Sequence, residues 1–376
     1  MGNPAEGKIR ICEIITGLEL SGAERVVCDI ATRLDPSRFE VEVIGIRGGE
    51  LVEWLENRGV QVHVLDITAK RQAYRVDKFF RLMRILRKGR FDIINTHLFH
   101  ADLLGRLARP SGVKYINTIH VAEHRTRPQQ FYFAKKLRRR CDRLVAVSNA
   151  VMEYHSHMSH LPHDAYTVIH NGVDTAQFRF DGKARNELRN RWDVGENEVL
   201  FAFVGRLDRQ KGLDTLFDAM RLANIMGRRM RVVLAGDGPL RNMVQDFMAN
   251  EAVGENIISL GFRNDIPAVL SAADVLVMPS RWEGLPMSLA EAMSVGLPAI
   301  ATKVEGPTEL VADGTTGLLI DKEQPPILAQ AMIRLADSPK LRSCMGMAAR
   351  QRVDELFSID RMIEQYEKLY LEMLDA

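Results

Sequence analysis

Alternation of short β-branched segments with stretches of helical periodicity constrains the fold of this chain more than any other feature of its sequence. The first series of such segments comprises Ile9–Ile15, Val41–Ile46, Val62–Ile67, Asp92–Thr96, Lys114–Thr118 and Arg143–Val147. The second comprises Val199–Val204, Met230–Ala235, Ile257–Leu260, Val275–Met278, Ala299–Thr302 and Gly317–Ile320. Strand, helix and strand in succession indicate parallel sheets with crossover connections. Each series is long enough for one doubly wound domain, so the sequence predicts an α/β chain with two parallel-sheet domains.

The length of 376 residues also suits two domains of ordinary size. Between the two series, Ile169–Asp174 contains an Asn-Gly turn and is followed by a polar segment through Gly182. We therefore predict a first domain over residues 1–174, a second over residues 175–357, and a cleft that opens at this linker. The final helix, Ile359–Leu374, has an apolar stripe that fits either domain.

Several classes of protein are disfavoured by composition. The chain has no run of about 18 apolar residues and its first residues lack the features of a signal peptide, so we expect a cytoplasmic protein. Four cysteines lie far apart without CxxC spacing, which indicates free thiols rather than disulfides or a zinc site. The run from Tyr154 to His163 is rich in histidine, but we reject a metal site there because the run is loop-like, follows a helix and has no cysteine nearby. We expect no metal.

Charge is unevenly distributed along the chain. Residues 1–174 carry 27 Lys and Arg against 20 Asp and Glu, whereas the remainder carries 24 against 29. In the densest basic stretch, Phe131–Cys141, helical spacing places apolar residues on one face and five cations largely elsewhere. These cations are Lys135, Lys136, Arg138, Arg139 and Arg140. Such a stretch is typical either of a solvated outer helix or of a surface for anionic lipid, which would place the protein peripherally on the inner face of the membrane. Nucleic acid is disfavoured because no nucleic-acid-binding module accompanies the cations.

A glycine-containing loop follows the first strand of each series. The first, from Gly17 to Glu24, contains Gly22. The second, from Phe203 to Gly212, contains Gly205, Arg206 and Lys211 and leads into a helix. Neither has the spacing of a Walker A or dinucleotide-binding motif, which disfavours an ATPase and a dehydrogenase. Arg206 and Lys211 are suited to neutralise a diphosphate without a metal, as the departure of a nucleoside diphosphate in sugar transfer requires.

A pair of glutamates eight residues apart marks the segment after the strand Val275–Met278. Pro286 disfavours a helical Leu285, so we place Glu283 in a loop and Glu291 on the first turns of a helix that begins near Met287. Carboxylates accept hydrogen bonds from paired sugar or ribose hydroxyls, and the N–H groups at a helix start bind phosphate or hydroxyl oxygens. The arrangement therefore predicts a sugar-nucleotide site.

These motifs resemble those of the retaining glycosyltransferases of group 1, also called family 4. The segment from Glu283 to Glu291 resembles the EX7E motif of that family. Further resemblances are Val204–Gly212, Ala235–Pro239, Val147–Ala150, Ile169–Asp174 and Gly306–Glu309, so that the likeness spans nearly the whole chain. One departure is Ser21 before Gly22, where the family often has a second glycine; a side chain at that position hinders close approach of the backbone to a ligand.

The resemblance implies a GT-B fold, in which two Rossmann-like domains face a central cleft and the helix over residues 358–376 packs back on the first, acceptor-side domain. It implies that Arg206 and Lys211 hold the donor diphosphate, that Glu283 contacts the transferred sugar, and that Glu291 binds the ribose. It places His120 near the phosphate and the acceptor, and we add His97 and His100 as weaker candidates on the acceptor side. The expected catalytic residues are Glu283, His120, Arg206 and Lys211. The expected donor-binding residues are Gly22, Gly205, Arg206, Lys211, Gly236, Glu283, Gly284, Leu285, Pro286, Met287, Ser288, Leu289 and Glu291.

The implied activity is transfer of a hexose or N-acetylhexosamine from a UDP- or GDP-linked sugar to a hydroxyl of a saccharide or lipid-linked acceptor, with retention of configuration. Such enzymes serve in cell-surface polysaccharide or glycolipid synthesis, and we expect neither a metal nor another cofactor. Two alternatives are a sugar-nucleotide epimerase of the same fold and a non-catalytic sugar-nucleotide-binding subunit. The presence of Arg206, Lys211, Glu283 and Glu291 together disfavours the second alternative.

Overall fold

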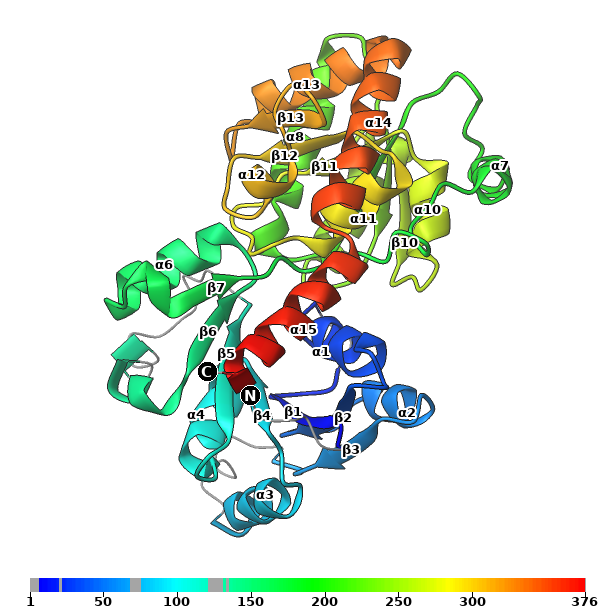
Figure 1. Cartoon of the computed structure of the whole chain (residues 1–376). Helices are drawn as coiled ribbons and strands as arrows, with labels where there is room; N and C mark the ends of the chain where they lie inside the picture. The colour runs from blue at the N-terminus through cyan, green and yellow to red at the C-terminus, as the bar shows by residue number, and fades with distance from the viewer. Residues whose placement is uncertain (1–6, 20–21, 68–75, 121–130, 133–134, 376) are drawn as a thin grey trace. The chain divides into compact units, whose positions relative to one another are not determined.

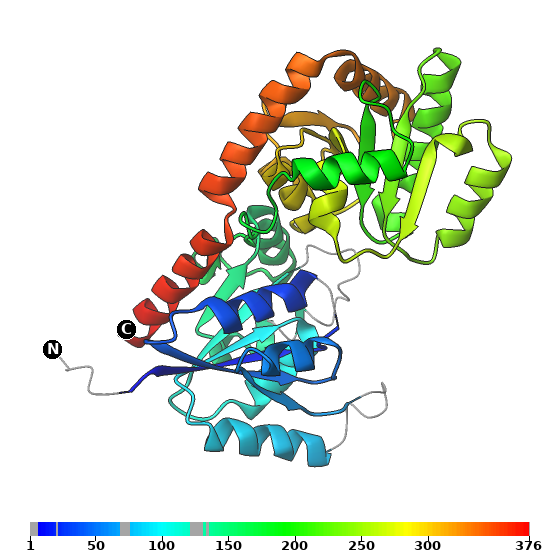
Figure 2. The same ribbon diagram turned by 90° about the vertical axis from the view of Figure 1, so that its right-hand side faces the viewer.

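The computed structural model describes residues 7–19, 22–67, 76–120, 131–132 and 135–375. The chain divides into two compact units. Unit 1 comprises Met1–Gly172 and Asp360–Ala376, and unit 2 comprises Val173–Ile359. Each unit contains one parallel sheet with helices on both faces, as Figures 1 and 2 show.

The sheet of unit 1 has seven strands in the order β3-β2-β1-β4-β5-β6-β7. Their bounds are β1 (Ile9–Ile15), β2 (Phe39–Gly45), β3 (Gln61–Val64), β4 (Ile93–His97), β5 (Lys114–Ile119), β6 (Arg143–Ala146) and β7 (Tyr166–Val168). The strand order reverses direction between β1 and β4, which is where ligands bind in doubly wound sheets. The six predicted strands are confirmed to within three residues at each end. The edge strand β7 was not predicted, because three residues are too short to establish an alternating pattern.

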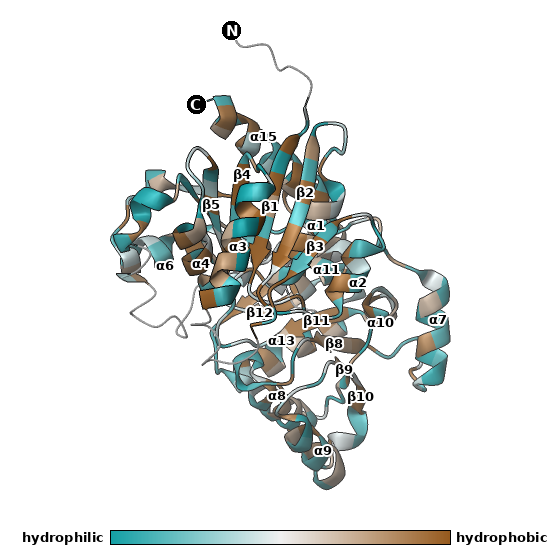
Figure 3. Cartoon of the chain, turned by 90° about the horizontal axis from the view of Figure 1, so that it is seen from below, coloured by the Kyte–Doolittle hydropathy of each residue, from teal (hydrophilic) through white to brown (hydrophobic). Residues whose placement is uncertain are grey.

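Helices cover both faces of this sheet. The first face carries α1 (Gly22–Arg33), α2 (Leu51–Glu56) and α15 (Ile359–Asp375). The second carries α3 (Val76–Lys88), α4 (Phe99–Ala108) and α6 (Asn149–Ser159). Two short 3₁₀ helices are η2 (Arg138–Arg140) and η3 (His163–Ala165). In Figure 3 the helices α1, α2 and α3 carry both hydrophilic and hydrophobic colour, as expected of helices with one face on a sheet.

The sheet of unit 2 has six strands in the order β10-β9-β8-β11-β12-β13. Their bounds are β8 (Leu200–Val204), β9 (Arg231–Ala235), β10 (Ile257–Gly261), β11 (Val275–Met278), β12 (Ala299–Thr302) and β13 (Gly317–Ile320). One face carries α7 (Gly182–Arg191), α10 (Ile266–Ala272), α11 (Met287–Val295) and α14 (Pro339–Leu356). The other carries α8 (Leu213–Ile225), α9 (Arg241–Asn250) and α13 (Pro325–Asp337). The short elements are α12 (Pro307–Leu310), η4 (Arg209–Lys211) and η5 (Gly254–Asn256).

The basic stretch after Phe131 differs from the single helix that the sequence predicted. Residues 131–132 and 135–136 are helical, but Arg138, Arg139 and Arg140 form the 3₁₀ helix η2. The helix ends there because Cys141 adopts an extended conformation just before β6. The side chain of Arg138 donates to the carbonyl of Cys141. Residue 134, expected on the apolar face, lies outside the described residues.

The histidine-rich run was expected in a loop, and this expectation was wrong for its first half. His155 and His157 lie within α6, His160 ends that helix in a left-handed conformation, and His163 begins η3. Ser148 caps α6 by accepting from the N–H of Val151, a start signal that favours the longer helix. Across the described ranges, no group of three or more His, Cys, Asp or Glu is placed to hold a metal ion. No helix of the described residues is long and apolar enough to cross a membrane.

Candidate functional site

Two glycines bring together the loops that follow β8 and β9 in unit 2. Gly205 and Gly236 have φ angles of 155° and 152°. A Cβ on Gly236 would lie 1.9 Å from the carbonyl oxygen of Gly205, so no larger residue fits there without displacing backbone. The N–H of Leu207 also donates to the carbonyl of Asp237 at 3.0 Å. At Gly205 and Gly236 the edge of the sheet therefore presents backbone, which a ligand can approach closely.

The structure brings Lys211 and Glu283 together although 72 residues separate them. The Lys211 Nζ lies 2.6 Å from Oε1 of Glu283, and the same oxygen accepts a hydrogen bond from the Ser280 hydroxyl at 2.7 Å. Gly212 permits this meeting, because its φ of 65° and missing Cβ let the chain pass against the carbonyl of Pro279. Glu283 as a whole residue is only 5% exposed, so the charge of its carboxylate depends on this ammonium group for compensation.

Arg206, in contrast, projects into solvent. Its side chain is 65% exposed, and its Nε lies 3.7 Å from the carboxylate of Asp208. An exposed pair at this distance contributes little, about 0 to 1 kcal/mol. The guanidinium can therefore exchange this partner for a more strongly charged ligand at small cost.

The helix α11 starts where the sequence predicted. Pro286 is its N-cap, with φ of −74° and ψ of 109°, and Gly296 ends it in a left-handed conformation. Glu283 lies in the preceding loop, and Glu291 lies half-buried on the helix. The loop after β12 reaches this region, because a Cβ on Gly306 would lie 2.0 Å from the carbonyl oxygen of Gly284. Leu285 and Leu289 are buried and Met287 is packed against the core, so their side chains hold the loop and helix in place.

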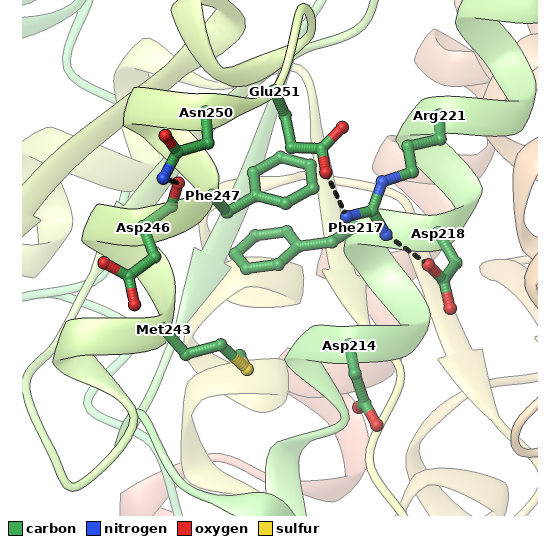
Figure 4. Close-up of a pocket in the computed structure, with 9 residues that line it drawn as sticks. All are labelled: Asp214, Phe217, Asp218, Arg221, Met243, Asp246, Phe247, Asn250 and Glu251. Atoms are coloured by element: carbon green, nitrogen blue, oxygen red, sulfur yellow. Dashed lines mark hydrogen bonds and ion pairs between the residues drawn. The ribbon is translucent and has the colours of Figure 1, made fainter.

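A separate pocket of 340 Å³ lies in unit 2 between α8 and α9 (Figure 4). Phe217 and Phe247 stack there with ring centroids 4.1 Å apart. Arg221 donates to Glu251 at 2.7 Å and to Asp218 at 2.6 Å, so these charges are satisfied within the protein. None of the predicted site residues lines this pocket, and we do not assign the predicted site to it.

In unit 1, the predicted residue His120, which is half-buried, joins a connected row of polar side chains whose other members, Glu13 and His97, are buried. His97 ends β4 and His120 follows β5. The His97 Nδ1 lies 2.8 Å from the His120 Nε2, and the His97 Nε2 lies 2.6 Å from Oε2 of Glu13. Glu13 and His97 have no exposed surface. Burial, and secondly the charge of His97, hold the pKa of His120 well below its usual value near 6.5.

Glu13 was missed from the sequence, although it was the one carboxylate within the apolar strand Ile9–Ile15 and therefore a detectable signal. Two other candidates do not join this row. His100 lies on α4 with its ring against that of Phe99. Gly22 begins α1, where an added Cβ would meet no atom within 4 Å, so the structure gives no steric reason for a glycine. Ser21 lies outside the described residues.

Known proteins resemble the chain along nearly its whole length. A family model described as Glycosyltransferase Family 4 matches residues 20–177, and one described as Glycosyl transferases group 1 matches residues 184–352. The UDP-Gal:alpha-D-GlcNAc-diphosphoundecaprenol alpha-1,3-galactosyltransferase of Escherichia coli is 28% identical over 98% of both chains. The alpha-D-kanosaminyltransferase of Streptomyces kanamyceticus is 30% identical over 50% of this chain and 49% of its own length.

Solved structures share the fold. A glycosyltransferase from Rickettsia africae ESF-5 superposes with a TM-score of 0.87 at 21% identity, covering 98% of this chain and 99% of that one. Anabaena HepE in complex with UDP also has a TM-score of 0.87 at 21% identity, covering 97% of this chain and 100% of that one. These likenesses confirm the predicted GT-B class of fold. The chain thus belongs to the group 1, family 4 glycosyltransferases, enzymes that transfer a sugar from a nucleotide sugar.

Proposed function

We propose that this enzyme transfers a hexosyl or N-acetylhexosaminyl group, with retention, from a UDP- or GDP-linked sugar to a hydroxyl of a lipid-linked or saccharide acceptor in cell-surface glycan synthesis. The observation that carries the proposal is the contact of Lys211 with Glu283 beside Gly205 and Arg206, on one loop edge of unit 2. This edge combines two cations with backbone that a ligand can approach closely.

In this proposal residues 175–357 bind the donor. Arg206 and Lys211 hold the diphosphate and stabilise the charge that develops on it as the sugar leaves, and this role needs no metal. Before the donor binds, Lys211 is held by Glu283, so the ammonium is already placed at the site. Glu283 contacts the transferred sugar and Glu291 accepts hydrogen bonds from the ribose. Gly236 and the N–H groups of Gly284, Leu285, Met287 and Ser288 supply the remaining donor contacts.

Residues 1–174, with the helix over residues 358–376, bind the acceptor in this proposal. His120 is the group of unit 1 that we assign to the substrate. Its Nε2 is occupied by His97, whereas its Nδ1 is enclosed without a partner among the described residues. A buried polar atom without a partner is uncommon in proteins and is consistent with a ligand contact.

An anionic membrane surface is the partner that would bring a lipid-linked acceptor to unit 1. Of the five cations after Phe131, Arg138 is partly exposed and the other four are exposed, and the side chain of Tyr132 beside them is 59% exposed. Arg109, the residue that follows α4, donates to the carbonyl of Arg140 at 3.0 Å, which ties this segment to the second face of the sheet. The neighbouring helix α3 adds further exposed cations and the 59% exposed Phe80. Cations beside exposed aromatic rings suit an anionic lipid surface.

Incubation of the purified protein with a panel of radiolabelled UDP- and GDP-sugars, with and without lipid extract, tests the proposal. Label transferred to lipid or saccharide is the expected result. Conversion or hydrolysis of the donor without an acceptor would instead indicate the epimerase. Binding without turnover in all conditions would indicate a non-catalytic subunit.

A further inference from the structure

One face of the unit 1 sheet is polar at its centre, where a hydrophobic core is expected. Glu13, Asn95, His97 and Thr118 lie on β1, β4 and β5 with no exposed surface. Asn95 is paired in register with Glu13, and the Thr118 hydroxyl donates to the side-chain Oδ1 of Asn95 at 2.9 Å. Burial of such groups is costly unless every one is hydrogen-bonded. Polar residues at the carboxyl ends of the central strands, where apolar residues would be more stable, therefore indicate a functional requirement.

Three hydrogen-bonding groups surround the Glu13 carboxylate. The His97 Nε2 lies 2.6 Å from Oε2, the Tyr370 hydroxyl donates to Oε1 at 2.9 Å, and the Asn95 amide donates to Oε1 at 3.4 Å. With the His97 ring donating, these groups place three donors on the two carboxylate oxygens, an arrangement that stabilises the ionised form. An ionised Glu13 in turn fixes a proton on the Nε2 of His97.

The proton inventory of the two imidazoles is then determined by charge balance. One hydrogen bond of 2.8 Å joins the His97 Nδ1 to the His120 Nε2, and it contains one proton. A buried negative charge without compensation is strongly unfavourable, and if the two rings supply that compensation they together carry one positive charge and three protons. Two of these protons lie on the His97 Nε2 and between the rings. The third therefore lies on the Nδ1 of His120, whichever ring owns the shared proton.

This Nδ1 is enclosed, and no group among the described residues accepts from it. The low pKa of His120 favours the arrangement in which the positive charge resides on His97, next to Glu13. The His120 ring is then neutral, accepts at Nε2, and has a single N–H to offer.

We propose that Glu13, His97 and Tyr370 are positioning residues that hold His120 as a hydrogen-bond donor, with its Nδ1–H directed to a substrate oxygen. The inference rests on the role that the proposed function gives to His120. It adds that an N–H at this position matches a phosphate oxygen or the oxygen of a sugar hydroxyl, both of which accept. The last helix, α15, also contributes to this arrangement, because its Tyr370 hydroxyl donates to the carboxylate of Glu13.

The proton on His120 can be observed directly by NMR of the whole protein labelled with ¹⁵N-histidine, because protonated and bare imidazole nitrogens have well-separated shifts. The His120→Asn variant assigns the signals. Wild type should show a protonated Nδ1 and a bare or shared Nε2 on His120. Glu13→Gln removes the charge and should leave Nδ1 bare, whereas Glu13→Asp keeps the charge and should retain the proton.

Glu42→Gln is the matched control, because Glu42 is also buried on this sheet and its Oε2 lies 3.0 Å from the Nε2 of His63, away from His120. It should leave the His120 signals unchanged. In the transfer assay, Glu13→Gln should lower kcat about tenfold to a hundredfold, the range known for partners that orient metal-bound imidazoles, with KM for the nucleotide sugar little changed. Glu13→Asp should recover part of kcat.

A bare Nδ1 on His120 of the wild type overturns the inference, and this spectrum needs no variant to fold. A proton that remains on Nδ1 in Glu13→Gln overturns it as well. The NMR measurement uses no substrate, so an inactive wild type in the transfer assay would refute the proposed function while the proton assignment stands. A bare Nδ1 in an active enzyme would refute the positioning role alone.

Discussion

The carboxyl edges of the two sheets share a topology but differ in chemistry. In unit 2 the edge is built from glycines, with Lys211 and the exposed Arg206 as its cations. In unit 1 it is built from side chains that are joined by hydrogen bonds, the buried Glu13 and His97 and the half-buried His120. All ten histidines of the chain lie before residue 173, and none lies in unit 2. Backbone N–H groups and cations suit a diphosphate. A neutral imidazole held in one orientation suits a single acceptor, such as the oxygen of a sugar hydroxyl or one phosphate oxygen. The same fold therefore supports two kinds of recognition, which differ in the residues placed at the ends of the central strands.

The largest effect should come from the charge difference between the two units. Reversal of Lys135, Lys136, Arg138, Arg139 and Arg140 to Glu should abolish cosedimentation with phosphatidylglycerol vesicles at low salt, because each cation near such a surface contributes about 1 kcal/mol. Nucleotide affinity should be preserved. The control reverses five exposed cations of unit 2, namely Lys183, Arg228, Arg229, Arg241 and Lys340, and should still bind. If the wild type does not bind these vesicles, the basic surface of unit 1 is only a solvated face and a soluble acceptor is favoured.

The next effect concerns the cations of unit 2. Arg206→Ala and Lys211→Ala should each lower the transfer rate by roughly 10² or more, because each removes charge that stabilises the departing diphosphate. Arg209→Ala is the control, since this exposed cation lies in the same loop and its carbonyl is bound by Arg281. EDTA should leave the wild type active. Complete loss of activity in EDTA, restored by Mg²⁺, would contradict a diphosphate site that works without metal.

The carboxyl edges of the two sheets also differ in how well their residues can be predicted from the sequence. In unit 2 most of the sequence signals lie close to the residues that they position. Pro286 and Gly296 mark both ends of α11, and the glycines of the loops are sequence neighbours of the cations. In unit 1 the partners of Glu13 are distant, and Tyr370 lies 357 residues away along the chain. Periodicity predicts strands and helices but carries no information about which polar side chains share a buried face across three strands and the last helix. The fold class was therefore predictable, whereas the row that holds His120 was not.

A third prediction separates the two glutamates of unit 2. Glu291→Ala should weaken binding of the free nucleoside diphosphate by about 1 to 3 kcal/mol, because the ribose loses its acceptor. Glu283→Ala should spare this binding and lose turnover, because the carboxylate acts on the transferred sugar. Calorimetry with UDP and GDP on both variants provides the comparison, with each variant as the control for the other. Equal losses of affinity would contradict separate roles.

The smallest predicted effect arises from the confinement of histidine to unit 1. The His155 Nδ1 lies 2.7 Å from the Tyr166 hydroxyl, and burial, with a smaller effect of Arg106, lowers the pKa of His155 to about 4. The unfolded chain, with a pKa near 6.5, binds more protons between these values, so stability falls as pH decreases from about 6.5 to about 4. The loss should be about 1 to 2 kcal/mol, allowing for residual hydration of the half-buried ring. Urea unfolding at pH 7 and pH 5 can be followed through Trp54, the tryptophan of unit 1, in protein with Trp192→Phe and Trp282→Phe. His155→Gln should reduce the dependence on pH, and an identical dependence in both proteins would show that this imidazole is not its source.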